Sequence, residues 1–187
     1  MKQSLVYPNF QSWKDHAIRT KSGLQVAPED FVIIDEYDNF QKEYFSFDEA
    51  MKIERRILRP NGWRLPTDKE WEELMLEHGE NSFSLTSELS LRFLGYLTEK
   101  SMKDFRLMGS DRSLTTMYSQ AKSGGQNGCG FYWTSTSSSR FSAFVFINSG
   151  DTLQTVPLNK YKGLSIRCVR GTHMRTMSIE EQQMMHA

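Results

Sequence analysis

The 187-residue chain carries 23 Lys and Arg against 23 Asp and Glu, so its formal net charge is zero. A neutral chain without a basic run lacks the charge pattern of a nucleic-acid-binding protein or of a protein held on an anionic membrane. Its 38% hydrophobic and 25% charged residues are ordinary for a soluble globular domain, and the sequence has no apolar run of the ~18 residues that a transmembrane helix needs.

The start of the chain, MKQSLVYPNFQSW, lacks the long apolar core of a signal peptide because polar and turn-forming residues interrupt it. We therefore expect a protein that is made in the cytosol and either stays there or is assembled there into a particle. The interrupting residues are Ser4, Tyr7, Pro8 and Asn9.

The first predicted element is a helix over residues 9–22, which Asn9 caps and Gly23 ends. Its apolar face would carry Phe10, Trp13 and Ala17. A short apolar run at residues 31–34 predicts a buried strand.

Two capping boxes predict the next two helices, at residues 46–59 and 67–78, which Pro60 and Gly79 end. A weaker helical pattern covers residues 86–94. The capping pairs are Ser46 with Glu49 and Thr67 with Glu70.

The second half of the chain changes character after Gly109: residues 119–130 have the composition of a loop, and strand-like runs follow. Residues 149–151 predict a hairpin turn between two of these runs. Both faces of the run 141–148 are partly apolar, so this strand is expected to be central in its sheet. The predicted strands are 131–136, 141–148, 152–156 and 164–169.

Helices that precede strands predict one α+β domain, with helices packed against a C-terminal antiparallel sheet formed by residues 131–169. Cys168 is expected to face the core as a small hydrophobic residue. The aromatic core that joins helix to sheet would contain Trp63, Trp71, Tyr132 and Trp133.

Three segments carry a family resemblance: GWRLPTDKEWEEL at 62–74, GFYWTSTS at 130–137 and KGLSIRCVR at 162–170. Together they resemble the Fibrobacter succinogenes major paralogous domain family, over about residues 31–170. The resemblance implies a C-type-lectin-like fold, related to the variable proteins of diversity-generating retroelements, to phage tropism determinants and to formylglycine-generating enzymes.

The resemblance also implies a cysteine before the Pro-x-Gly-Trp element, paired with the cysteine of the last strand. Here that position is Arg59, so Cys168 lacks the expected partner. The other cysteine, Cys129, lies far from Cys168 in the sequence, and a reducing compartment favours free thiols. A disulfide would stabilise a secreted relative by about 2–4 kcal/mol, so its loss fits a protein that meets no oxidising compartment.

Catalytic and metal-binding chemistry is not favoured, and we expect neither a metal nor a cofactor. The triplets with which lectins bind calcium and sugar are absent, and two cysteines with four scattered histidines have no zinc-site spacing. Formylglycine-generating chemistry needs a close cysteine pair, although Cys129 alone remains a candidate reactive thiol between two glycines. The acidic residues at 68–73 are explained by their place in the first turn of a helix.

The remaining candidate for function is a surface formed by two loops, 137–141 and 159–162, which we expect to lie together on one exposed face near the turn at 149–151. In the retroelement relatives the corresponding loops look like the ligand-contacting face, and Tyr and Arg are frequent binding anchors. The expected ligand-binding residues are Ser137, Ser139, Arg140, Phe141, Asn159, Lys160, Tyr161 and Lys162.

These observations predict a non-catalytic binding protein, or a virion-associated one used for phage attachment or decoration. A secreted bacterial surface adhesin is the alternative, and an enzyme of the formylglycine-generating type is disfavoured. The expected partners are other protein subunits of a virion or homo-oligomer, and a host surface protein or glycan. Neither nucleic acid nor membrane insertion is expected. The expected location is a virion assembled in the host cytoplasm, with the bacterial cell surface as the alternative.

Two flanks lie outside the resemblance. Residues 1–30 are interpreted as a flanking segment with an assembly helix, and residues 171–187, which hold four methionines, as a tail able to form a helix. Apolar helical flanks of this kind favour association with another subunit, while folding back onto their own domain is the alternative.

Overall fold

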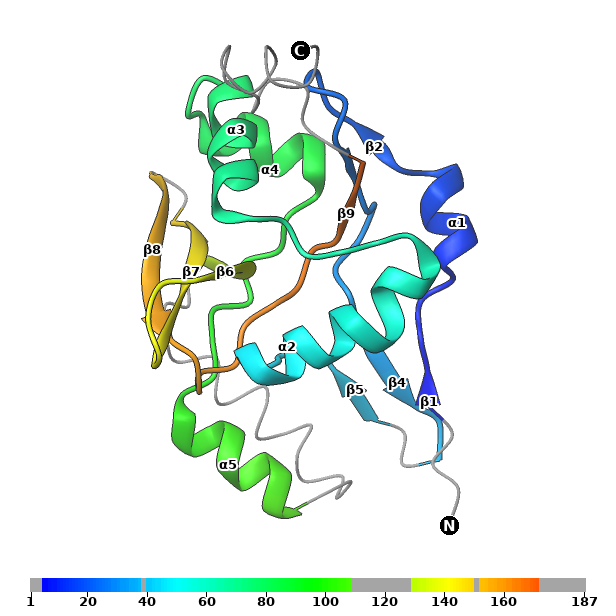
Figure 1. Cartoon of the computed structure of the whole chain (residues 1–187), viewed down its shortest axis with the longest axis vertical. Coiled ribbons are helices and arrows are strands. Elements are labelled where there is room, and N and C mark those ends of the chain that lie inside the picture. The colour runs from blue at the N-terminus through cyan, green and yellow to red at the C-terminus, as the bar shows by residue number, and fades with distance from the viewer. Residues whose placement is uncertain (1–4, 38–39, 109–128, 150–151, 172–187) are drawn as a thin grey trace, which may run out of the picture.

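The computed structural model describes residues 5–37, 40–108, 129–149 and 152–171 (Figure 1). The Met-rich tail, the loop at 119–128 and two residues of the turn at 149–151 lie outside this description. The elements in chain order are β1 (Leu5–Val6), α1 (Phe10–Asp15), β2 (Ile18–Arg19), β3 (Gln25–Val26), β4 (Ile33–Asp35), β5 (Phe40–Lys42), α2 (Phe47–Ile53), the π-helical turn η1 (Glu54–Leu58), the 3-10 turn η2 (Arg59–Asn61), α3 (Asp68–Glu77), α4 (Ser82–Leu89), α5 (Glu99–Met108), β6 (Gly130–Ser137), β7 (Ser142–Asn148), β8 (Leu153–Asn159) and β9 (Val169–Arg170).

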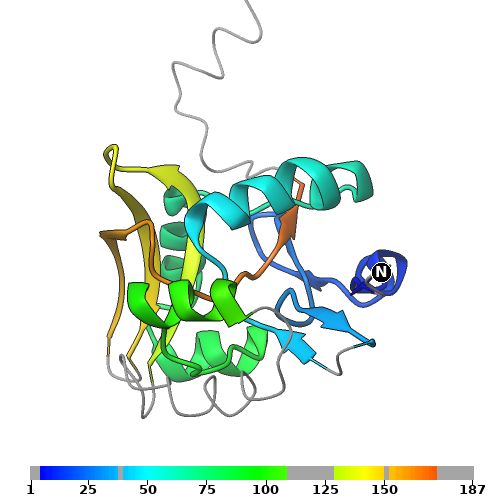
Figure 2. The same cartoon turned by 90° about the horizontal axis from the view of Figure 1, so that it is seen from below.

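The described strands form three antiparallel sheets of three strands each, in the orders β6-β7-β8, β1-β4-β5 and β2-β3-β9. Both views place the longest sheet on one side of the molecule and the two small sheets on the other (Figures 1 and 2). Helices α2, α3, α4 and α5 lie around and between these sheets (Figures 1 and 2). The predicted α+β class is confirmed. Within the described residues, no helix is long and apolar enough to cross a membrane.

The main sheet has β7 at its centre, as the two partly apolar faces of that strand predicted. Strand β8 pairs with β7 in continuous register from Ser142 opposite Asn159 to Asn148 opposite Leu153. A register shift between Trp133 and Ser137 interrupts the pairing of β6 with β7. Such a bulge bends a strand locally and redirects its end.

Pro157 lies on the open edge of this sheet, opposite Phe144. The amide of Lys160 donates to the carbonyl of Phe141 at 2.9 Å, and hydrogen-bonded pairs in an antiparallel ladder alternate with non-hydrogen-bonded ones. Counting from that pair, Pro157 falls in a non-hydrogen-bonded pair, so its nitrogen points away from β7. A proline is therefore tolerated there without loss of a ladder bond.

The last predicted strand, 164–169, is not part of the main sheet, and this corrects the expected sheet of residues 131–169. Ser165 runs beside β6, where it exchanges backbone hydrogen bonds with Phe131 and Trp133 at 3.1 Å each. The chain then leaves, and β9 pairs with β3 instead, with Val169 opposite Val26. The segment thus connects the main sheet to a small one.

The two capping boxes begin α2 and α3 as predicted, since in each the cap hydroxyl and the third-residue carboxylate exchange hydrogen bonds with the backbone. Helix α2 continues through η1 and η2 to Gly62, whose φ of 83° permits the left-handed turn that ends it.

Two other predicted helices have different limits. The helix expected at 9–22 ends at Asp15, because Ile18 and Arg19 form a hairpin with β3 around Gly23, whose φ is 94°. The helix expected at 86–94 is α4, earlier in the chain, capped by Asn81 and ended by Ser90 in the left-handed region. The strand expected at 31–34 begins only at Ile33.

The core consists of two clusters, with Trp63 and Trp133 in the first and Trp71 and Tyr132 in the second. The predicted aromatic set is therefore buried but divided. Trp13 belongs to the first cluster, and the β2–β3 hairpin contributes Leu24 and Val26 to the second. Residues 10–30 are thus an integral part of the domain, which corrects the boundary expected at residue 31.

Candidate functional site

The two loops expected to form a ligand face lie side by side at one end of the main sheet. Ser142, at the start of β7, pairs with Asn159, at the end of β8. The next pair outward is Phe141 and Lys160, joined by the 2.9 Å backbone hydrogen bond described above. We call residues 137–141 and 159–162 together the loop face.

Ser149, the described residue of the turn expected at 149–151, is not near the loop face, which corrects that expectation. Strand β7 runs from Ser142 to Asn148, so the loop face lies at one end of the strand and Ser149 at the other. At about 3.3 Å per residue, seven residues place Ser149 roughly 20 Å from the loop face.

The turn between β6 and β7 is fixed by its own serine side chains. The Ser139 hydroxyl accepts hydrogen bonds from the amides of Phe141 at 3.2 Å and Ser142 at 3.1 Å. The Ser138 hydroxyl shares a 2.8 Å hydrogen bond with the hydroxyl of Ser142, and the Ser137 hydroxyl donates to the carbonyl of Ser139 at 3.0 Å. These bonds limit the conformations of the turn before any ligand arrives.

Two aromatic side chains are exposed on this fixed backbone. Phe141 is 59% and Tyr161 57% exposed. The guanidinium of Arg140 lies 5.4 Å from the ring centroid of Phe141. The amide of Tyr161 donates to the side-chain oxygen of Asn159 at 2.7 Å, which fixes the second loop in the same way.

Two lysines of the loop face lie over buried or half-buried rings. Lys160 Nζ is 5.1 Å from the ring centroid of Phe47, the first residue of α2, and Lys162 Nζ is 4.7 Å from that of Tyr96. Lys162 also faces the carboxylate of Glu99, the first residue of α5, at 3.8 Å. The loop face therefore lies where β8 meets the starts of α2 and α5 (Figure 1).

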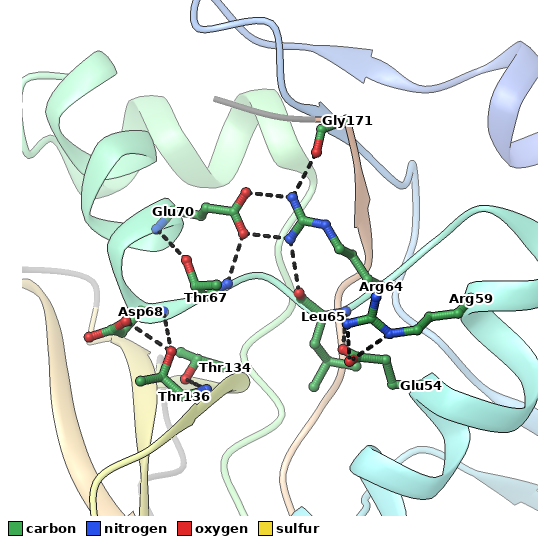
Figure 3. Close-up of polar contacts among 10 residues, drawn as sticks. All are labelled: Glu54, Arg59, Arg64, Leu65, Thr67, Asp68, Glu70, Thr134, Thr136 and Gly171. Atoms are coloured by element: carbon green, nitrogen blue, oxygen red, sulfur yellow. Dashed lines mark hydrogen bonds and ion pairs between the residues drawn. The ribbon is translucent and has the colours of Figure 1, made fainter. Parts of the chain in front are cut away.

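The end of β6 is held by the start of α3, as Figure 3 shows. The hydroxyl of Thr136 donates to the carboxylate of Asp68 at 2.9 Å and accepts from the Asp68 amide at 3.2 Å. The amide of Ser135 donates to the carbonyl of Pro66 at 2.8 Å. The bulged end of β6 is thereby attached to the helix start just before the turn that carries the loop face.

The start of α3 is in turn braced by a partly buried ion pair (Figure 3). Both oxygens of Glu70 accept from Arg64, at 2.6 and 2.7 Å, and this hydrogen bonding raises the pKa of Arg64. Arg64 also donates to the carbonyl of Gly171 at 2.7 Å. The acidic residues of this helix that were interpreted as capping residues, Asp68 and Glu70, therefore have structural partners.

Arg59, which stands where the resemblance implies a cysteine, has an ionic partner instead. Its guanidinium lies 2.9 Å from Glu54, whose other oxygen accepts the amide of Leu65 at 2.8 Å. Cys168 is a free and fully buried thiol, and burial raises its pKa well above the ordinary value. Cys129 is also free, and half-buried.

A buried ion pair that the sequence did not reveal lies behind a surface cavity of about 400 Å³. The guanidinium of Arg167 contacts Asp30 at 2.9 Å, and the hydroxyl of Tyr132 donates to the same carboxylate at 3.1 Å. Burial raises the pKa of Asp30, against the effect of both partners. Arg167 alternates along its strand with the core residue Cys168, and no local signal marks Asp30 as its partner.

Arg167 is a structural group because its other donors are also satisfied. It donates to the carbonyls of Ala27 at 3.2 Å and Ser90 at 3.1 Å, and to that of Leu89. The guanidinium that lines this cavity is therefore engaged with protein groups through both terminal nitrogens and Nε. Among the residues described, no cluster of three or more His, Cys, Asp or Glu side chains is arranged to hold a metal.

Comparison with known families gives one match. The model of the Fibrobacter succinogenes major domain matches residues 10–170, and the chain therefore belongs to this family. The matched range includes α1 and the β2–β3 hairpin, in agreement with their place in the core. No curated protein matches the chain.

Proposed function

We propose that this member of the Fibrobacter succinogenes major domain family is a non-catalytic binding module, built on a C-type-lectin-like scaffold, whose loop face contacts the ligand. The observation that carries the proposal is the pair of exposed rings, Phe141 and Tyr161, on two turns fixed by their own hydrogen bonds. A large ring loses little entropy on binding when the backbone beneath it is already ordered.

The polar contacts that hold the scaffold beneath the loop face also favour binding over catalysis. The ion pairs near α3 and at Arg167 join segments that are distant in the sequence. The guanidinium groups of Arg64 and Arg167 also donate to the backbone carbonyls of Gly171 and Ala27, so they are engaged within the protein. Cys168, with its raised pKa, is a poor nucleophile. An enzyme of the formylglycine-generating type is therefore disfavoured.

We place the module in a virion assembled in the host cytoplasm, as an attachment or decoration protein. A free Cys168, with Arg59 at the position where the resemblance implies its cysteine partner, suits a reducing compartment. A bacterial surface adhesin is the alternative, with a host protein or glycan as ligand in either case. Association with other subunits would use a different surface, for which the exposed Leu76 (63%) and Phe83 (82%) of α3 and α4 are the candidates.

The test measures binding of the labelled full chain to a panel of intact bacteria, immobilised glycans and bacterial surface proteins. For each surface bound, Phe141→Ala/Tyr161→Ala should weaken binding by at least about 30-fold, the effect of losing roughly 2 kcal/mol at a hot spot. Leu76→Ala/Phe83→Ala is the matched control, since it removes equally exposed apolar groups elsewhere.

Melting temperatures of both double variants should equal that of the wild type, because all four side chains are exposed. Binding that survives loss of Phe141 and Tyr161 but fails in the control would refute the loop face. Sedimentation velocity of the same proteins addresses assembly: an oligomer that dissociates only in the control variant assigns α3 and α4 to the subunit contact.

A further inference from the structure

We infer that the loop face takes an acidic protein surface, one that presents carboxylates beside apolar side chains. The inference rests on the proposed function and adds to it the chemistry of the ligand. Three features carry it: the charge of the loop face, the state of its hydroxyl groups, and the rings beside its cations.

The loop face has a surplus of positive charge although the whole chain is neutral. It holds Arg140, Lys160 and Lys162 and no acidic residue. Among the described residues, the carboxylate within ion-pair distance of these three cations is Glu99, at 3.8 Å from Lys162. Neither the exposed Arg140 nor the half-buried Lys160 has a carboxylate of the described residues within ion-pair distance, so both charges are left for a partner.

The small polar side chains of the loop face are engaged within the protein. The hydroxyls of Ser137, Ser138 and Ser139 bond within their own turn, and the side-chain oxygen of Asn159 accepts the amide of Tyr161. A neutral sugar is recognised by a dense set of free donors and acceptors, and the serine hydroxyls of the loop face already bond to groups of their own turn. Positive charge and exposed ring surface are therefore the main features that the loop face offers to a partner.

The cations and rings lie next to one another, which suits a protein partner. Arg140 lies against Phe141, and Lys160 is held over Phe47. Ring contacts restrict these flexible side chains before binding, so less conformational entropy is lost when a partner binds. A carboxylate that reaches Arg140 would bring its neighbouring side chains onto Phe141 and Tyr161, so charge and apolar contact are matched in one footprint.

The experiment uses the full chain and immobilised polymers as probes, read by biolayer interferometry at low and high salt. A random copolymer of Glu and Tyr has the proposed chemistry. A copolymer of Lys and Tyr reverses the charge, heparin supplies acidic polysaccharide, and dextran supplies neutral sugar. We expect binding to the Glu–Tyr copolymer at least ~10-fold stronger than to the other three, and weakened about tenfold by salt.

Charge reversal then assigns the contact to the loop face. Arg140→Glu/Lys160→Glu should abolish binding to the Glu–Tyr copolymer. The matched control is Arg55→Glu/Arg56→Glu, an equal charge change at two exposed cations of η1 that lack a ring neighbour among the described residues. An equal loss in both variants would show that only net charge matters and would overturn the inference.

The other outcomes are also decisive. Stronger binding to heparin identifies an acidic polysaccharide, equal binding to the Lys–Tyr copolymer identifies a purely apolar face, and absence of binding to every polymer at low salt removes the charge argument. Each of these overturns the inference. If the panel ligand is lost on Phe141→Ala/Tyr161→Ala but not on charge reversal, the proposed function stands and this inference alone fails.

Discussion

Replacing Arg167 by Met should destabilise the domain more than any surface change. Methionine keeps an unbranched apolar stem like that of arginine but removes the guanidinium that faces Asp30 at 2.9 Å. Three backbone carbonyls, those of Ala27, Leu89 and Ser90, lose their donor at the same time. Breaking one side of a buried ion pair costs about 3–5 kcal/mol, because the other charge stays buried without compensation.

The loss of stability in Arg167→Met should depend on pH in a defined direction. Burial already raises the pKa of Asp30 with Arg167 in place, and without Arg167 it should rise further above the unfolded value of about 3.9. A carboxyl whose folded pKa is raised destabilises the fold increasingly as pH rises from the unfolded to the folded value. The gap in unfolding free energy between wild type and Arg167→Met should therefore widen as the pH rises above the folded pKa of Asp30 in the wild type, and narrow as the pH falls below it.

Urea unfolding at several pH values measures this gap, and the double variant Arg167→Met/Asp30→Asn tests its origin. Neutralising Asp30 removes the uncompensated charge and leaves the unpaired carbonyls, so part of the loss should be recovered. The reasoning would be refuted by a loss below about 1 kcal/mol at pH 7. A gap that does not change with pH, or a double variant less stable than Arg167→Met, would refute it as well.

Three further outcomes follow from the same contacts. Thr67→Ala removes the cap hydroxyl of α3 and should cost about 1 kcal/mol in urea unfolding, whereas Thr67→Ser should cost little. Burial and its raised pKa keep the Cys168 thiol protonated at pH 8. A thiol reagent should therefore label the half-buried Cys129 in the native protein, and Cys168 only after unfolding. Prompt labelling of Cys168 in the native protein would contradict its burial. Gly163→Ala would place a Cβ 2.3 Å from the sulfur of Met102, so we expect a loss of about 1–3 kcal/mol and a lower melting temperature; an unchanged melting temperature would show that Met102 can move aside.

The parts of the fold that the sequence predicted well depend on local rules. Capping boxes act over four residues, so the starts of α2 and α3 were found from Ser46 and Thr67. Alternation acts along one strand, so β6, β7 and β8 were found, and the adjacency of the loop face follows from hairpin pairing.

The parts that were missed depend on contacts between distant segments. Arg167 is buried with Asp30, which precedes it by 137 residues, and no local pattern in its strand indicates this pairing. The segment before β9 divides its hydrogen bonds between two sheets, which no local pattern encodes. The hairpin at Gly23 shortened α1 because the Ile18–Val26 pairing outweighs the helical pattern of residues 16–22.

The position of Pro157 affects how copies of this chain interact when they lie close together. An edge strand offers a row of outward amides on which a second copy can extend the sheet, and such growth leads to aggregation. In β8 the outward amides belong to alternate residues, and Pro157 is one of these positions, in the middle of the strand. Proline has no amide hydrogen, so the row of donors is interrupted there. Identical copies can then lie close together at high concentration without β8 of one copy pairing with β8 of the next.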